Sequence, residues 1–421
     1  MTKKREKPKR EFTKRQLSQW QQQKKRQRII IISGIFIIAA VLLVVGTGWY
    51  ISEYRPLHQT VIRVNDVEFD MNYYVKVLKF YGEGQPSYFM YNLADEVVKV
   101  IERNELVRQE AKELGISVSN EEVDRELKSR DPPLSKDYRD MIRTEILAGK
   151  LLDEYFEPKV PVLAEQRHIM AMLLESESQA TEVRARLNGG EDFGELAGEL
   201  SLDEVSRDKK GDLGWHPKEI IAELLATSVP GEQAFSADVA VLSQPIYDEE
   251  VIKNAGYWLV KVIERDQETG EAFIKAILLG SEEQAQQVKS RLEAGENFTA
   301  LAAELSQDKG SKENGGELGW LTEGMMGSDF DEFVFNPEVE LNTLSEPISD
   351  EMAWTQGGYW LIKVLDRDDN REVEESDRSW LKTKALNEWV SSLWDNPNNE
   401  VDDSYLDEEK KAWALERALG G

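Results

Sequence analysis

Residues 277–320, ILLGSEEQAQQVKSRLEAGENFTALAAELSQDKGSKENGGELGW, decide the fold because the chain carries a second copy of this stretch. Residues 172–215, MLLESESQATEVRARLNGGEDFGELAGELSLDEVSRDKKGDLGW, overlay it without a gap. The copies align again where LSQPI matches LSEPI and GYWLVKVIERD matches GYWLIKVLDRD. Each copy predicts a strand, two helices, a glycine-rich loop and a final apolar strand. The sequence therefore predicts two homologous α+β domains, residues 166–266 and 271–367.

Charge is distributed unevenly along the chain. Residues 1–28 contain 12 Lys/Arg and 2 Asp/Glu, whereas the remainder contains 40 Lys/Arg against 78 Asp/Glu. The long acidic part repels phosphate backbones, so we expect no nucleic-acid partner. The sequence has no cysteine, which excludes disulfides, thiol nucleophiles and Cys-ligated zinc. No motif for a phosphate loop or a metal site is present, and we expect no cofactor.

A hydrophobic segment, residues 29–51, follows the basic segment 1–28 and predicts a transmembrane anchor. It has 23 residues and no charge, enough to cross a hydrocarbon core of about 30 Å. Basic residues precede it, and Trp49 and Tyr50 stand near its end. This pattern predicts a cytoplasmic N-terminus and an extracytoplasmic bulk in a single-pass cell-membrane protein. A cleaved signal peptide and a buried core helix are the alternatives.

Residues 55–162 predict a small helical module with one short strand. The strand, TVIRVNDVEFD, contains a turn at Asn65-Asp66, and amphipathic helices follow it. Gly115 is expected to end one helix, and Ser119 or Asn120 to cap the next. Residues 368–421 form an acidic tail with a tryptophan-containing helix that we expect to pack on this module, with a role of the tryptophans at the membrane interface as the alternative. Residues 395–411 of the tail predict a mobile segment.

The two repeats resemble parvulin-type peptidyl-prolyl isomerase domains. The likeness is carried by a strand that begins with His-Ile, by Leu-Ser-x-Asp before Gly-Gly-x-Leu-Gly-Trp, by Ser-x-Pro-Ile and by Gly-Tyr-x-Leu-x-Lys-Val. The helical module, including LGISVSNEEVDREL at residues 114–127, is similar to the N-terminal chaperone domain of the SurA/PrsA type. The resemblance covers roughly residues 60–367. It implies isomerisation of the bond before proline, without a cofactor or a covalent step.

The resemblance also implies site residues, because a parvulin cleft provides two histidines, an Asp or Cys, and a Met and a Phe that line a proline slot. In the second repeat Asp308, Met326 and Phe330 match, whereas Phe273 and Trp360 replace the histidines. In the first repeat His168 and Asp203 match, Trp258 replaces the second histidine, and no clear Met or Phe is present. Neither repeat is complete.

Each of these residues also has a purely structural interpretation. His168 can be a hydrogen-bonded residue at the start of a strand, and both aspartates can cap their loops. Met326 and Phe330 can be ordinary core residues, and His216 is expected at the surface.

The sequence is compatible with three functions. The first is a membrane-anchored foldase that isomerises prolyl bonds in exported, unfolded proteins, with its activity in the second repeat. The second is a non-catalytic holdase that uses degenerate parvulin domains to bind peptides, which the missing histidines favour. The third is a scaffold in one dedicated membrane complex.

Overall fold

The computed structural model describes residues 24–25, 34 and 36–419, and the chain divides into two compact units. Unit 1 combines the chain up to Glu157 with the chain from Thr383 onward, and unit 2 is Pro158–Lys382. Each unit contains both helices and a β-sheet, so the predicted α+β class is confirmed.

One helix, Phe36–Leu57, is long and apolar enough to cross a membrane. None of its apolar window is buried against the protein. Its last part is η1 (Tyr50–Tyr54) and α2 (Arg55–Leu57). The first residues of the predicted anchor, 29–33, lie outside the described residues, as does nearly all of the basic segment 1–28.

The helical module of unit 1 begins with a hairpin of β1 (Thr60–Val64) and β2 (Val67–Asp70), whose turn places Asn65 at a φ of 52°. Ser119 accepts a hydrogen bond from the Glu122 amide while the Glu122 side chain accepts one from the Ser119 amide, a capping box that confirms the predicted helix start. The helices that follow the hairpin are α3 (Met71–Gly82), α4 (Ser87–Glu113), α5 (Asn120–Ser129), η2 (Lys136–Tyr138), α6 (Arg139–Lys150), η3 (Leu151–Phe156) and η4 (Glu157–Lys159).

The C-terminal tail completes unit 1 through α16 (Glu375–Asp395), β9 (Val401–Asp402) and α17 (Glu408–Ala418). Trp389 packs edge-on against Phe156 with ring centroids 5.9 Å apart, and the buried Leu393 belongs to the module core. The predicted packing of the tail on the module is therefore confirmed. The predicted mobility of residues 395–411 is wrong, because β9 pairs with β1 and so extends the hairpin to a three-stranded sheet.

Unit 2 is built on one six-stranded antiparallel sheet with the order β4-β3-β8-β5-β6-β7. Its strands are β3 (Leu163–Leu174), β4 (Asp212–His216), β5 (Ile246–Arg265), β6 (Ala272–Leu279), β7 (Glu317–Leu321) and β8 (Ile348–Glu372). Its helices are α7 (Glu177–Asn188), α8 (Phe193–Leu200), α9 (Glu204–Asp208), α10 (Lys218–Leu224), α11 (Val229–Ser236), α12 (Glu282–Glu293), α13 (Phe298–Leu305), α14 (Lys309–Lys312) and α15 (Ser328–Val334).

The two repeats exchange their final strands within this sheet. The final strand of repeat 2 is the second part of β8, and it pairs with β3, the opening strand of repeat 1. The final strand of repeat 1 is the second part of β5, and it pairs with β6, the opening strand of repeat 2. β5 and β8 also pair with each other where they run from one half of the sheet to the other.

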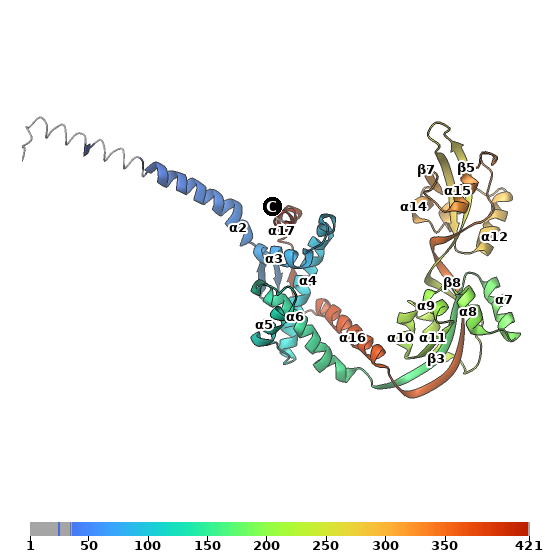
Figure 1. The fold of residues 1–421 in the computed structure, drawn as a ribbon, viewed down its shortest axis with the longest axis horizontal. Coiled ribbons are helices and arrows are strands. Elements are labelled where there is room, and N and C mark those ends of the chain that lie inside the picture. The colour runs from blue at the N-terminus through green and yellow to red at the C-terminus, as the bar shows by residue number, and fades with distance from the viewer. Residues whose placement is uncertain (1–23, 26–33, 35, 420–421) are drawn as a thin grey trace, which may run out of the picture. The chain divides into compact units, whose positions relative to one another are not determined.

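Strand exchange creates two lobes that differ from the sequence repeats (Figure 1). Lobe 1 combines residues 163–251 with residues 359–372, and lobe 2 is the continuous segment 257–353. Unit 2 has four hydrophobic core clusters among its described residues, and each lies within one lobe. Two are in lobe 1 and two are in lobe 2. The predicted boundaries 166–266 and 271–367 describe the repeats, whereas the packing follows the lobes. The two final strands are nearly identical in sequence, so each can complete either sheet.

Candidate functional site

In lobe 2, Met326 and Phe330 lie in one apolar cluster with Trp258. Phe330 lies on α15 and is 2% exposed, and Trp258 lies on β5 and is 5% exposed. Their rings meet edge-on with centroids 5.9 Å apart. The indole Nε1 of Trp258 donates a hydrogen bond of 2.9 Å to Oδ2 of Asp350. The tryptophan beside the candidate proline slot therefore comes from the other repeat, not from Trp360.

Lobe 1 has the same arrangement with the repeats reversed. Trp360 of repeat 2 is fully buried, and its Nε1 donates a hydrogen bond of 3.0 Å to Oδ2 of Asp248. Asp248 is 2% exposed and also accepts a hydrogen bond of 2.7 Å from the Thr227 hydroxyl. Asp248 and Asp350 were not singled out from the sequence, although both stand in a Pro-Ile-x-Asp-Glu motif that the repeats share. That repeated motif was the available signal.

The two matching aspartates cap short helices. Oδ2 of Asp308 accepts a hydrogen bond of 2.8 Å from the Ser311 amide and another from the Ser311 hydroxyl, at the start of α14. Oδ1 of Asp203 accepts a hydrogen bond of 2.6 Å from the Ser206 amide, at the start of α9. These contacts supply the local role that the sequence left as an alternative. A role of either carboxylate in catalysis stays a prediction.

Asp203 should weaken lobe 1 at neutral pH, because burial raises the pKa of this carboxyl against the lowering effect of its Ser206 hydrogen bonds. Because the pKa of Asp203 is higher in the folded state than in the unfolded state, its contribution to the free energy of unfolding is fully present below the unfolded-state pKa. That contribution is lost as the pH rises through the folded-state pKa. We expect Asp203→Asn, which keeps an acceptor for the Ser206 amide, to be at least as stable as wild type at pH 7. Thermal unfolding at pH 3 and pH 7 measures this. A variant that loses stability only at neutral pH would contradict it.

His168 lies in the middle of β3, where its Nε2 is 2.7 Å from Oδ1 of Asp212 and its ring lies 5.7 Å from that of Trp215. In lobe 2 the equivalent pair is Phe273 and Trp320, with ring centroids 5.5 Å apart. His168 is opposite Asp366 on β8, whereas Trp360 is opposite Leu173. Along the paired strands β3 and β8, His168 therefore lies five residues, roughly 16 Å, from Trp360, so the two residues are not neighbours.

His216 is not a surface residue, so that expectation was wrong. Only 12% of its side chain is exposed. Its Nδ1 lies 2.7 Å from Oδ2 of Asp377 and its Nε2 lies 2.9 Å from the carbonyl of Leu213. Asp377 is also buried and comes from the start of α16, which the sequence does not connect to this histidine.

No group of three or more His, Asp or Glu side chains is placed to hold a metal ion among the residues that the structure describes. In lobe 2 the candidate site is an apolar aromatic wall, which we define as Met326, Phe330 and Trp258. The carboxylate of Asp350 accepts the hydrogen bond of the Trp258 indole. Phe330 and Trp258 are almost fully buried in this cluster and Met326 packs against them, so all three contribute to the core of lobe 2, the structural role that the sequence left as an alternative for Met326 and Phe330.

Three family models, with two descriptions between them, match the chain. "PPIC-type PPIASE domain" matches residues 168–264 and, in a second form, residues 257–368. "SurA-like N-terminal domain" matches residues 17–139. Together they account for the predicted resemblance in both repeats and in the helical module.

The curated relatives of this chain include SurA chaperones and PrsA foldases. The chain is 33% identical over 288 residues to "Chaperone SurA" from Alcanivorax borkumensis, a match that covers 64% of this chain and 58% of that protein. It is 38% identical over 99 residues to "Foldase protein PrsA" from Geobacillus kaustophilus, covering 24% of this chain and 33% of that protein. The chain thus spans less than two thirds of the length of these relatives.

Among solved structures, foldase protein PrsA from Streptococcus pneumoniae is 12% identical, with coverage of 86% of this chain and 95% of that chain and a TM-score of 0.27. This superposition is too poor to support an argument. The domain assignment therefore depends on the sequence matches, which cover both repeats and most of the helical module. By these matches the chain contains a SurA-like N-terminal domain and two PPIC-type, parvulin-like PPIase domains, and it is similar in sequence to SurA chaperones and PrsA foldases.

Proposed function

We propose that this chain is a membrane-anchored foldase that binds unfolded exported polypeptides and isomerises their prolyl bonds. The observation that carries this proposal is the aromatic wall of lobe 2, where Met326, Phe330 and Trp258 share one cluster. The apolar helix Phe36–Leu57 supports a single-pass cell-membrane anchor. In this topology the N-terminus is cytoplasmic and the two units are extracytoplasmic.

Prolyl isomerisation requires the enzyme to bind the twisted amide better than either planar form. The barrier of about 18–20 kcal/mol comes from amide resonance, so no bond has to be made or broken. In the proposed site, Met326 and the aromatic wall hold the proline ring and exclude water, which favours the less polar twisted amide. Asp308 contributes as the polar residue of the cleft, and His168 with Asp203 forms a weaker second site in lobe 1.

Full-length protein in detergent is expected to accelerate the slow, proline-limited refolding of an unrelated client. Met326→Ala should lower that acceleration about tenfold, equal to 1.4 kcal/mol of transition-state binding. Met352→Ala is the matched control, because Met352 is 86% exposed on β8. Asp308→Asn keeps the helix cap and tests the charge, whereas Asp308→Ala removes both. A folded protein without any acceleration would reject catalysis.

Holdase activity is the second candidate, and exposed aromatic residues of the helical module favour it. Tyr88 and Tyr91, at the start of α4, are 76% and 68% exposed. Such side chains can cover apolar segments of an unfolded chain. A holdase without catalysis would suppress aggregation of a client that lacks proline and would leave the rate of proline-limited refolding unchanged.

A further inference from the structure

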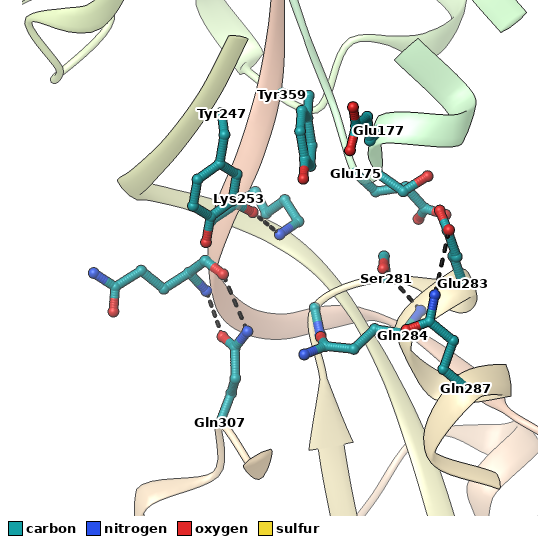
Figure 2. A pocket seen from close by; sticks show the side chains of 14 residues that line it. Glu175, Glu177, Tyr247, Lys253, Ser281, Glu283, Gln284, Gln287, Gln307 and Tyr359 are labelled. Carbon is teal, nitrogen blue, oxygen red and sulfur yellow. Dashed lines mark hydrogen bonds between the residues drawn. The ribbon is translucent and has the colours of Figure 1, made fainter. Parts of the chain in front are cut away.

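A cavity of about 350 Å³ lies where β5 and β8 cross between the lobes (Figure 2). Its lining includes the N-terminal ends of α7 and α12, which are equivalent helices of the two repeats. Neither repeat alone can form this cavity, because lobe 1, lobe 2 and both crossing strands contribute to its lining. It is separate from Met326 and Phe330, which are not among its lining residues.

The cavity has an excess of negative charge. Its lining contains three carboxylates, Glu175, Glu177 and Glu283, and one amine, Lys253. Within the described part of the chain, no lysine or arginine forms an ion pair with any of the three glutamates. Glu283 accepts a hydrogen bond of 2.5 Å from the Ser178 hydroxyl, so this contact joins α12 to α7.

Lys253 offsets the charge of these carboxylates only in part. It is 2% exposed, and its Nζ donates a hydrogen bond to the carbonyl of Gly357. Burial lowers the pKa of Lys253 to about 8, although the nearby Glu175 raises it. Burial also raises the pKa of Glu175, whose Oε2 accepts a hydrogen bond of 3.0 Å from the Tyr257 hydroxyl. The carboxylate is thus desolvated without a full counter-charge, a situation that a bound cation would relieve.

Two tyrosines form an aromatic side of the same cavity. The rings of Tyr247 and Tyr359 have centroids 5.1 Å apart at an angle of 48°. Tyr247 is 57% exposed, so its ring is accessible to an incoming group. Aromatic faces attract cations, and arginine in particular stacks on them. Carboxylates beside aromatic rings are the chemistry that receives a guanidinium or ammonium group.

We propose that this cavity binds the cationic side chain, arginine or lysine, of an extended polypeptide client. The inference rests on the proposed function, because it names the class of client segment that the chain holds. A guanidinium suits the site best, since its planar donors match carboxylates in pairs and its face stacks on tyrosine. The negative charge disfavours an anion at these helix ends, where Ser176 and Ser281 already cap the helices.

Peptide binding to the full-length protein in detergent tests the proposal. The probes are two fluorescein-labelled unstructured peptides, one in which arginine alternates with leucine and one with the neutral isostere citrulline at each arginine. We expect the arginine peptide to bind about tenfold more tightly by fluorescence anisotropy. Glu175→Gln with Glu283→Gln should remove this preference, since both amides keep their hydrogen-bond acceptors but lose the charge.

Glu195→Gln with Glu199→Gln is the matched control, because both are exposed glutamates of α8, neither is among the lining residues, and the pair removes the same amount of charge. It should retain the tenfold preference, whereas a general attraction of the acidic surface for cations would fall equally in both variants. Equal binding of the two peptides to wild type, or equal effects of the two variants, would overturn the proposal.

The same proteins also distinguish this proposal from the proposed function. If wild type accelerates proline-limited refolding or suppresses client aggregation, but its peptide binding does not depend on Glu175 and Glu283, only the cavity proposal fails. If wild type does neither, the proposed function fails, whatever the peptide measurements show.

Discussion

A fragment of residues 256–353 is expected to fold alone as lobe 2, although it begins in one repeat and ends in the other. It contains β5 from Gly256 onward, β6, β7, helices α12 to α15 and the first residues of β8. Both core clusters of lobe 2 fall inside it. It also keeps the hydrogen bond between Trp258 and Asp350. The measurements are cooperative thermal unfolding and dispersed amide signals in NMR.

The control fragment is residues 271–367, which has the boundaries of repeat 2. This fragment lacks the β5 residues that fill the lobe 2 core, including Trp258, Leu259, Val260 and Val262. It can replace them with the matching residues of β8 only if β8 turns back instead of continuing straight. Each such side chain contributes about 1.5–3 kcal/mol by burial, and a domain has only about 5–15 kcal/mol of stability. A control that unfolds cooperatively while residues 256–353 remain unfolded would contradict strand exchange.

Trp360→Ala is expected to destabilise lobe 1 by about 3–5 kcal/mol, the usual cost of truncating a buried tryptophan. Trp360 is fully buried in the core of lobe 1, although its sequence belongs to repeat 2. The substitution also removes a donor from the buried carboxylate of Asp248. Hydrogen exchange resolved along the chain should show faster exchange in β3 and α10, with β6 and α12 little affected.

Trp258→Ala is the matched substitution in the other repeat. Since Trp258 lies in lobe 2, the same measurement should show faster exchange in β6 and α15 and little change in β3. A result in which each substitution loosens its own repeat would mean that the final strands are not exchanged. The pair of variants therefore tests the topology of the intact chain without relying on fragments.

The sequence was sufficient for the features that depend on local pattern. The capping box at Ser119 and the turn at Asn65 follow from residue types at fixed spacing, and the repeats follow from direct comparison of two stretches. The predicted packing of the tryptophan-containing tail helix on the helical module also agreed with the structure. Local propensity did not reveal β9, because two residues acquire strand geometry only by pairing with β1.

The candidate site could be predicted only in part. Similarity to parvulins identified Met326 and Phe330 as neighbours, and they share a cluster. It placed Trp360 beside them, in the position of the second parvulin histidine, whereas in the structure Trp258 is the tryptophan that contacts Phe330. The carboxylates of Asp350 and Asp248 were missed because the hydrogen bonds that they accept from the tryptophans cross from one repeat to the other.

By itself, the sequence determined that this protein has an apolar segment fit to span a membrane, a helical module and a duplicated α+β domain, because periodicity, charge and repetition are properties of neighbouring residues. Only the tertiary structure decided which final strand completes which sheet. Two strands as similar as GYWLVKVIERD and GYWLIKVLDRD have nearly equal side-chain patterns for either partner, so the choice depends on whether β5 and β8 turn back or continue straight. They continue, and the cavity between the lobes exists for that reason.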